Sequence, residues 1–318
     1  MKKKLLTSLF FAAACVSTLT VGAQTIAFAD QRAGWLEKAR TNMPELIRTE
    51  VKPQWIVCSE KDPEAFQGWR MVRTEPIDSL YNSSFKSRKE VIVDFGDHYT
   101  GYFTFRIDHT GMPADAPLRF RLTFAEVPAE LNTPFDPYPG SLSRAWLQDE
   151  VVTVMHLPDT VTLERRLACR YVKIELLAQS YYDFRISDMK LEAVSSASGE
   201  GRPLEPTVDP MIARINEIGL KTLKECMQTV YEDGPKRDQR LWIGDLYLES
   251  MANTYSFENH ALTRRCLYLL AALADEDGWL HATVYELPKP EPQINQHTMD
   301  YSLLYGVTLL EYLKEVDI

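Results

Sequence analysis

Alternating hydrophobic and polar positions dominate the chain between about residues 91 and 194. In the run 118–124, leucine or phenylalanine occupies every second position, and arginine or threonine occupies the positions between them. This period of two is typical of a strand with one buried face. Further runs of β-branched and aromatic residues, separated by turn residues, surround it, and Trp55 and Trp69 precede them. The pattern predicts an antiparallel β-sandwich.

A different pattern begins after the small, polar and proline-containing segment 195–206, which we interpret as a linker. Apolar residues then recur at helical spacing from Ile212 to Val230, and Asp209-Pro210 supplies a cap and a first-turn proline. Further helices are predicted at 245–255, 259–274 and 298–316. The second part of the chain is therefore predicted to be helical.

The amino terminus has the features of a secretory signal peptide, because three lysines at residues 2–4 precede an apolar run at 5–21 and small residues follow. Cleavage is expected after residue 23 or residue 29. Ala12–Cys15 leaves a lipoprotein site as a minor alternative. The predicted organisation is a signal peptide at 1–23, a β-sandwich domain at 24–198 and a helical domain at 199–318. We expect export to the periplasm or the extracellular space.

Charge and composition narrow the possible partners. The formal net charge is -10 and the sequence pI is about 5.2, which argues against nucleic acid as a partner. No window of the mature chain has the apolar length of a membrane span. Four cysteines remain after export; they lack C-x-x-C spacing, so we expect no zinc cluster. A Cys226–Cys266 bridge is possible if their helices are neighbours, although buried free thiols are the favoured interpretation. The six histidines lack H-x-x-H pairing, and no metal site is expected.

The segment 231–249 carries the most chemistry, because Asp233, Asp238 and Asp245 flank a Gly-Pro turn together with two arginines and Trp242. A turn at Gly-Pro lets the three carboxylates converge from a loop and the head of the next helix. Carboxylates accept hydrogen bonds from sugar hydroxyls, and one with a raised pKa can protonate a glycosidic oxygen. The alternative is that these aspartates only cap and stabilise a helix start.

The sequence D-G-P-K-R-D-Q-R-L-W-I-G-D at 233–245 resembles the catalytic segment of the inverting α-L-rhamnosidases and their six-hairpin glycosidase relatives. The resemblance implies that Asp238 is the general acid and that Asp233, Trp242 and Asp245 occupy the other motif positions. It also implies β-sandwich domains followed by an (α/α)6 barrel, of which 199–318 would be a part. The runs V-D-F-G at 93–96 and F-A-E at 124–126 resemble the strand pattern of the family's sandwich domain.

The chain departs from the family in two ways. The family's general acid is usually glutamate, whereas this chain has Asp238, and Glu249 is a nearby substitute. A six-hairpin barrel also needs more than the four helices predicted here, and the family's general base has no matching position. We therefore expect an amino-terminal fragment, with apolar helix faces left uncovered.

The remaining candidates would bind or orient the sugar. Arg237 or Arg240 would orient the carboxylates, Trp242 would stack on the sugar or pack in the core, and Trp279 is a second candidate wall. The predicted function is inverting hydrolysis of a terminal α-L-rhamnosyl or similar glycoside, with a carbohydrate substrate and no cofactor. The alternatives are a non-catalytic carbohydrate-binding protein and another six-hairpin glycosidase or lyase.

Overall fold

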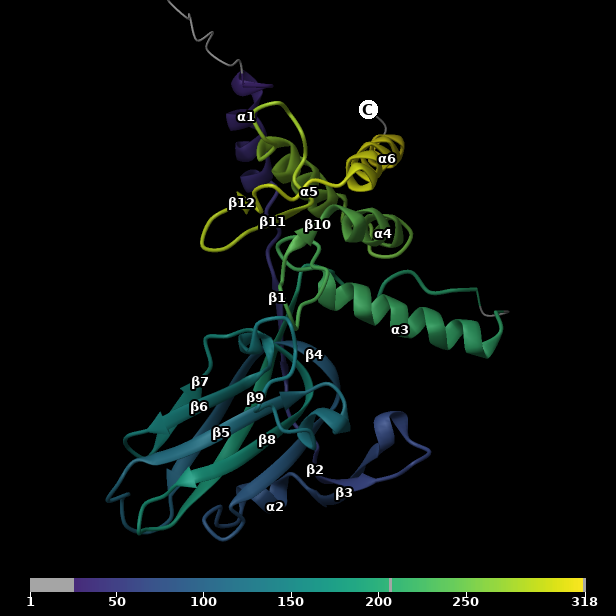
Figure 1. Ribbon diagram of the computed structural model, residues 1–318. Coiled ribbons are helices and arrows are strands. Elements are labelled where there is room, and N and C mark those ends of the chain that lie inside the picture. The colour runs from purple at the N-terminus through teal and green to yellow at the C-terminus, as the bar shows by residue number, and fades with distance from the viewer. Residues whose placement is uncertain (1–25, 206–207, 317–318) are drawn as a thin grey trace, which may run out of the picture.

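The computed structural model describes residues 26–205 and 208–316 and has an antiparallel β part followed by a helical part (Figure 1). This order confirms the predicted fold class. The predicted signal peptide, 1–23, lies outside the described residues. Within the described part, no helix has the length and apolar character needed to cross a membrane.

The β part is one curled sheet in which every strand pair is antiparallel. Its main path is β1-β9-β4-β8-β5-β6, while β2, β3 and β7 pair beside it. A short helix, α2 (Asp78–Tyr81), packs near its edge. The strands are β1 (Ile47–Val51), β2 (Trp55–Lys61), β3 (Trp69–Pro76), β4 (Glu90–His109), β5 (Leu118–Ala125), β6 (Asp149–Val154), β7 (Asp159–Thr162), β8 (Leu167–Ala178) and β9 (Phe184–Ser195).

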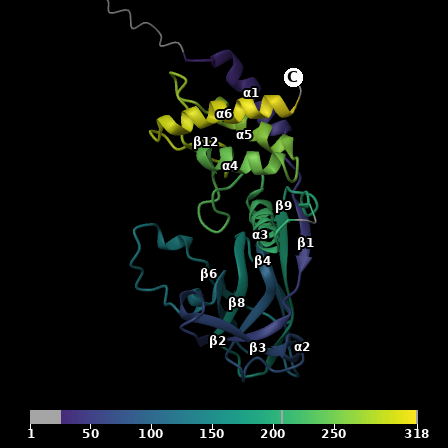
Figure 2. The same ribbon diagram turned by 90° about the vertical axis from the view of Figure 1, so that its right-hand side faces the viewer.

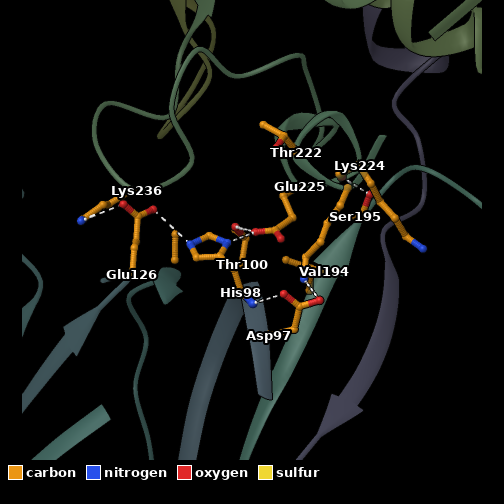
Figure 3. Close-up of polar contacts among 12 residues, drawn as sticks. Asp97, His98, Thr100, Glu126, Val194, Ser195, Thr222, Lys224, Glu225 and Lys236 are labelled. Atoms are coloured by element: carbon orange, nitrogen blue, oxygen red, sulfur yellow. Dashed lines mark hydrogen bonds and ion pairs between the residues drawn. The ribbon is translucent and has the colours of Figure 1, made fainter. Parts of the chain in front are cut away.

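The long strand β4 joins the two faces of the curled sheet. Before an irregularity between Asp94 and Tyr99 it pairs with β2 and β8; beyond it, the pairing with β8 continues to Gly101, and β9 and β7 also pair with it. Such bulges bend a strand and re-aim its side chains. This one brings His98 to the end of the sheet that faces the helical part (Figure 3).

The period-two pattern decides which side chains form the sandwich core. In β5, Leu118, Phe120 and Leu122 are fully buried, while Arg119 and Arg121 are exposed, as the sequence predicts. Phenylalanines from several strands meet there in mostly edge-to-face pairs: Phe103 with Phe124, Phe105 with Phe120, and Phe120 with Phe184. Such pairs are favourable beyond the burial of apolar surface.

The helical part contains α3 (Pro210–Cys226), α4 (Ile243–Thr254), α5 (His260–Ala272) and α6 (Met299–Glu315). A small sheet of β10 (Leu241–Trp242), β11 (Thr283–Tyr285) and β12 (Glu291–Pro292) lies among them. The bounds of α4, α5 and α6 were predicted to within two residues, whereas α3 ends at Cys226, four residues before the predicted end at Val230. The predicted cap of α3 is present, since Asp209 accepts from the backbone N–H of Met211 at 2.8 Å.

One further helix, α1 (Ala29–Thr41), lies within the predicted segment 24–198 and packs on α5 of the helical part (Figures 1 and 2). The buried Arg265 of α5 donates to the backbone carbonyl of Ala39 at 2.6 Å. From α1 the chain continues into β1, which pairs with β9. The amino-terminal segment therefore contacts both parts of the molecule. A local sequence pattern could not predict that α1 packs on α5, because the two helices are far apart in the chain.

Apolar side chains are exposed on the helices. Among the described residues they include Ile212, Ile215 and Ile218 of α3 and Leu303, Val307 and Leu310 of α6. A groove of about 650 Å³ lies between α1, α5 and α6, with Trp35, Tyr268 and Tyr305 in its lining. The four cysteines in the described part are free thiols, so Cys226 and Cys266 are not bridged.

Replacing Phe120 by Ala tests the importance of the aromatic core. The loss of a fully buried ring should lower the free energy of unfolding by about 3–5 kcal/mol, measured by urea denaturation. Phe66, whose ring is 71% exposed, provides the control, and Phe66→Ala should change stability by less than about 0.5 kcal/mol. Equal effects of the two substitutions would contradict this description of the core.

Candidate active site

The three aspartates of the sequence motif lie around the loop between α3 and α4. We call residues 232–240 the aspartate loop. A backbone bridge between Met227 and Tyr231 precedes it, and Asp233 N–H donates to the carbonyl of Arg240 at 3.2 Å across its neck. Gly234-Pro235 provides the predicted turn, and Gln239 adopts a left-handed conformation with φ 53°. The loop is thus closed on itself before α4 begins.

Asp233 and Asp238 form a hydrogen-bonded pair in this loop. The side chains are 13% and 3% exposed, so little water reaches either carboxyl group. Burial, the hydrogen bond to Asp238 and the charge of Asp238 raise the pKa of Asp233 to about 8. Two ionised carboxylates could only accept hydrogen bonds, whereas a protonated Asp233 can donate to Asp238. Asp233 therefore holds a proton at neutral pH.

Arg237 and Trp242 supply donors to the pair. The guanidinium Nη2 of Arg237 lies 3.0 Å from Asp233 Oδ2 and 3.6 Å from Asp238 Oδ2. The indole Nε1 of Trp242 donates to Asp238 Oδ2 at 3.1 Å. Trp242 is also the N-cap residue of α4, so none of the three aspartates caps this helix. Asp245 lies in the first turn of α4, where the predicted helix-stabilising role still applies to it, whereas Asp233 and Asp238 precede the helix. Trp242 is joined directly to the aspartate pair.

Asp245 and Glu249 continue the acidic group along one face of α4. They are four residues apart, the spacing that brings side chains to the same face of a helix. Burial and, more weakly, the charge of Asp238 raise the pKa of Asp245. Burial and the charge of Asp245 raise the pKa of Glu249 well above its usual value. The four predicted carboxyl groups therefore influence one another.

Two tyrosine rings pack against the residues that surround this acidic group. Tyr301 of α6 meets the Trp242 ring edge to face, with 6.5 Å between centroids. Its ring also lies where a side chain at Gly244 would be, since an added Cβ would come within 2.7 Å of it. Arg240 lies 4.1 Å over the ring of Tyr285. Glycine at 244 thus allows α6 to approach the start of α4.

Trp279 lies apart from the other candidates. Its backbone N–H donates to Asp275, the residue is 61% exposed, and a side chain added at the adjacent Gly278 would meet Ala27 and Phe28 near the start of α1. No contact found in the described residues joins Trp279 to the aspartates. Its predicted place as a wall of the same site therefore receives no support from the structure.

The sequence analysis did not identify Arg166 and Glu232 as part of this site. Arg166, just before β8, contacts both carboxylate oxygens of Glu232 at 2.6 and 2.5 Å and Gln228 Oε1 at 3.1 Å. Glu232 directly precedes Asp233 and is buried. Its adjacency to the motif was the only signal in the sequence, because Arg166 lies 66 residues away.

Several polar atoms in this region are buried without a hydrogen-bond partner. They include Oδ1 of Asp233, Oδ1 of Asp238 and Oε2 of Glu249. Buried polar atoms usually have partners, so unpartnered ones mark places where a ligand hydroxyl could bind. Within 26–205 and 208–316, no cluster of His, Cys, Asp and Glu is arranged to hold a metal ion. The arrangement is suited to proton transfer and to binding a polyhydroxylated ligand.

Comparison with known families agrees with this arrangement. Residues 53–193 match the glycosyl hydrolase family 78 alpha-rhamnosidase N-terminal domain, and residues 206–301 match the bacterial alpha-L-rhamnosidase 6 hairpin glycosidase domain. The second match contains the aspartate loop and α4. No curated protein matches the sequence significantly.

Solved structures include a rhamnosidase from Klebsiella oxytoca with rhamnose bound, which is 38% identical with a TM-score of 0.86. The match covers 90% of this chain and 56% of that chain, so the protein described here spans just over half the length of that relative. The α-L-rhamnosidase from Dictyoglumus thermophilum is 17% identical with a TM-score of 0.55, over 85% of this chain and 26% of that chain. The latter similarity concerns the fold alone.

The raised pKa of Asp233 predicts how stability depends on pH. An acid that binds its proton more tightly when folded contributes most stability below its unfolded pKa of about 3.9 and loses it as pH rises through its folded value, here about 8. Asp233→Asn cannot ionise, so it should gain stability over the wild type as pH rises from 5 to 9. The gain should grow by about 1 kcal/mol for each pH unit up to about pH 8 and level off above it, measured by urea denaturation.

The exposed Asp188, which pairs with Lys52 on the β part, supplies the control. The difference between Asp188→Asn and the wild type should not show the same trend over this pH range. A pH-independent difference for Asp233→Asn would show that Asp233 is ionised throughout.

Proposed function

We propose that this chain, which belongs to the glycosyl hydrolase family 78 α-L-rhamnosidases, provides the proton-donating half of an exported enzyme that hydrolyses terminal α-L-rhamnosyl glycosides. The observation that carries this proposal is the Asp233–Asp238 pair, which retains a proton at neutral pH between Arg237 and the Trp242 indole. The signal-peptide pattern at 1–23 supports export. The reaction requires no organic cofactor.

The pair accounts for the acid step. Asp238, at the family's acid position, delivers the shared proton to the glycosidic oxygen as the bond to the anomeric carbon breaks. Both aspartates are then ionised, and Arg237, in contact with each, stabilises the two carboxylates. The N–H of Trp242 additionally stabilises ionised Asp238. Asp245 and the unpartnered oxygen of Glu249 bind hydroxyl groups of the sugar.

Inversion requires a second carboxylate that activates water on the opposite face of the sugar, roughly 6.5–9.5 Å from the acid. Asp233 and Asp238 are hydrogen-bonded, so they are too close to serve as that pair. We propose that the base comes from another part of the six-hairpin barrel, to which α3, α4, α5 and α6 of the described residues belong. The match covers only 56% of the Klebsiella oxytoca rhamnosidase, which is compatible with this proposal.

Hydrolysis of aryl α-L-rhamnosides tests the proposed function. The 318-residue chain is compared with the protein encoded by any longer reading frame that contains it. In the active form, Asp238→Asn should reduce kcat by about 100-fold or more on a poor leaving group such as an alkyl rhamnoside, and by less on an activated dinitrophenyl rhamnoside. This difference is expected because an activated leaving group needs little protonation. Proton NMR of the first product should show the inverted anomer.

Asp188→Asn, far from the aspartate loop on β9, should leave kcat unchanged and serves as the matched control. The proposal fails if no form of the wild-type protein hydrolyses any α-L-rhamnoside. The assignment of Asp238 alone fails if Asp238→Asn loses activity equally on both leaving groups.

A further inference from the structure

The aspartate loop is held to the β part by charged groups that the proposed reaction does not use. Lys236 lies in this loop between Asp233 and Asp238, and its Nζ contacts Glu126 Oε2 at 3.0 Å and also Glu130. Glu126 follows β5, and Glu130 lies in a short 3-10 helix, 128–131. The backbone N–H of Glu126 donates to Glu130 at 2.7 Å, which fixes the two carboxylates relative to each other. Lys236 is therefore bound to two carboxylates on the β part of the molecule.

Glu126 is also connected, through His98, to Glu225 of α3, the helix that precedes the aspartate loop (Figure 3). Glu126 Oε1 lies 3.0 Å from His98 Nε2, and His98 Nδ1 lies 2.6 Å from Glu225 Oε2 in the last turn of α3. Thr100 also donates to Glu225 at 3.0 Å. The two ends of the segment 225–236 are thus attached to one chain of side chains on the sheet.

The charge on His98 matches this geometry. An imidazole that contacts a carboxylate with each nitrogen can donate both bonds only when it is protonated. Burial opposes that charge, but the hydrogen bonds to Glu126 and Glu225 outweigh it and raise the pKa of His98 to about 9. At neutral pH two cations, His98 and Lys236, therefore alternate with the carboxylates of Glu225, Glu126 and Glu130.

A second attachment acts beside the first. Arg166 of the β part contacts Glu232, and its backbone carbonyl accepts from the Gln239 side chain at 3.5 Å. Residues on both sides of Lys236 are thereby held as well. The loop's own hydrogen bonds, such as Asp233 N–H to the carbonyl of Arg240, close its neck, and these contacts attach it to the sheet.

We propose that Lys236 is a positioning residue: through the Glu126–His98–Glu225 chain, the β part holds the aspartate loop in the conformation that keeps Asp233 and Asp238 hydrogen-bonded. This inference rests on the proposed function for its kinetic consequence, but its structural consequence is independent of it. Among the described residues, no contact joins Lys236 to the aspartate pair or to the groups proposed to bind the sugar. Its effect on the reaction is therefore exerted through the loop.

The first experiment titrates the Asp233 carboxyl by ¹³C NMR in the ligand-free 318-residue chain. Loss of a nearby cation would by itself raise the pKa of a carboxyl group, whereas separation of Asp233 from Asp238 would lower it. Lys236→Met should therefore lower the pKa of Asp233 by about one unit or more if Lys236 positions the loop. Lys236→Arg, which keeps the charge and the donors, should restore the wild-type titration.

The matched control is Lys190→Met, which removes a lysine that pairs with Glu50 on the outer surface of the β part. It should leave the titration of Asp233 unchanged. A pKa that rises or does not move in Lys236→Met overturns the proposal. If Lys236→Met fails to fold, Glu130→Gln replaces it, because this substitution weakens only one of the two partners of Lys236. Glu130→Gln should lower the pKa of Asp233 by a smaller amount. An unchanged titration of Asp233 in Glu130→Gln also overturns the proposal.

The second experiment measures hydrolysis in whichever form of the protein is active. Lys236→Met should lower kcat by about tenfold while KM stays within about twofold, because the acid is displaced and sugar contacts are retained. Lys236→Arg should recover most of the loss. An equal loss in Lys190→Met, or an unchanged kcat in Lys236→Met, contradicts the positioning role. If no rhamnoside is hydrolysed at all, the proposed function fails, and the NMR titration still decides the role of Lys236.

Discussion

The close approach of two buried carboxyl groups, Asp233 and Asp238, is the constraint on which the arrangement of this site depends. Such a pair cannot ionise fully without strong repulsion in a region that water barely reaches. Three features reduce this repulsion: the raised pKa of Asp233, the guanidinium of Arg237 and the indole N–H of Trp242. Each of these interactions also controls when a proton can leave the pair.

A loop that carries such a pair tends to spread apart unless other contacts restrain it. The restraint comes mainly from the β part, where Arg166 binds Glu232 and Glu126 binds Lys236. Removing one partner of a buried ion pair is usually costly because the other charge remains unpaired. The ionic contacts between the two parts of the molecule therefore resist the repulsion that the aspartates create.

Local patterns predicted much of this molecule. The alternation in 118–124 fixed which face of β5 is buried, and the spacing of Asp233, Asp238 and Asp245 located the loop. What could not be predicted depends on residues far apart in the chain. His98 and Glu225 are separated by 127 residues, and nothing near His98 in the sequence indicates an acidic partner. The packing of α1 on α5 is hidden for the same reason.

Trp242 illustrates the limit for a residue that was identified. Its neighbours Leu241 and Ile243 are fully buried, so sequence alone left both a sugar-stacking and a core role open. The structure adds a third role, because the indole donates to Asp238 while the ring packs against Tyr301. A hydrogen bond between side chains four residues apart in a loop has no periodic signature, unlike a pair on a helix.

The contacts between the two parts also bear on whether the β part acts as an independent carbohydrate-binding module. The chain passes from α1 on the helical part into β1 on the sheet, and the sheet then contacts the aspartate loop at Glu126, His98 and Arg166. Charges buried at this boundary are stable only when they are paired across it, because an unpaired buried charge is unfavourable. A module joined only by a flexible linker would not need such pairs. Ser195 and Ser196, at the start of the predicted linker, are themselves buried and donate to the carbonyl of Met227. The β part is therefore better understood as the support on which the aspartate loop is held.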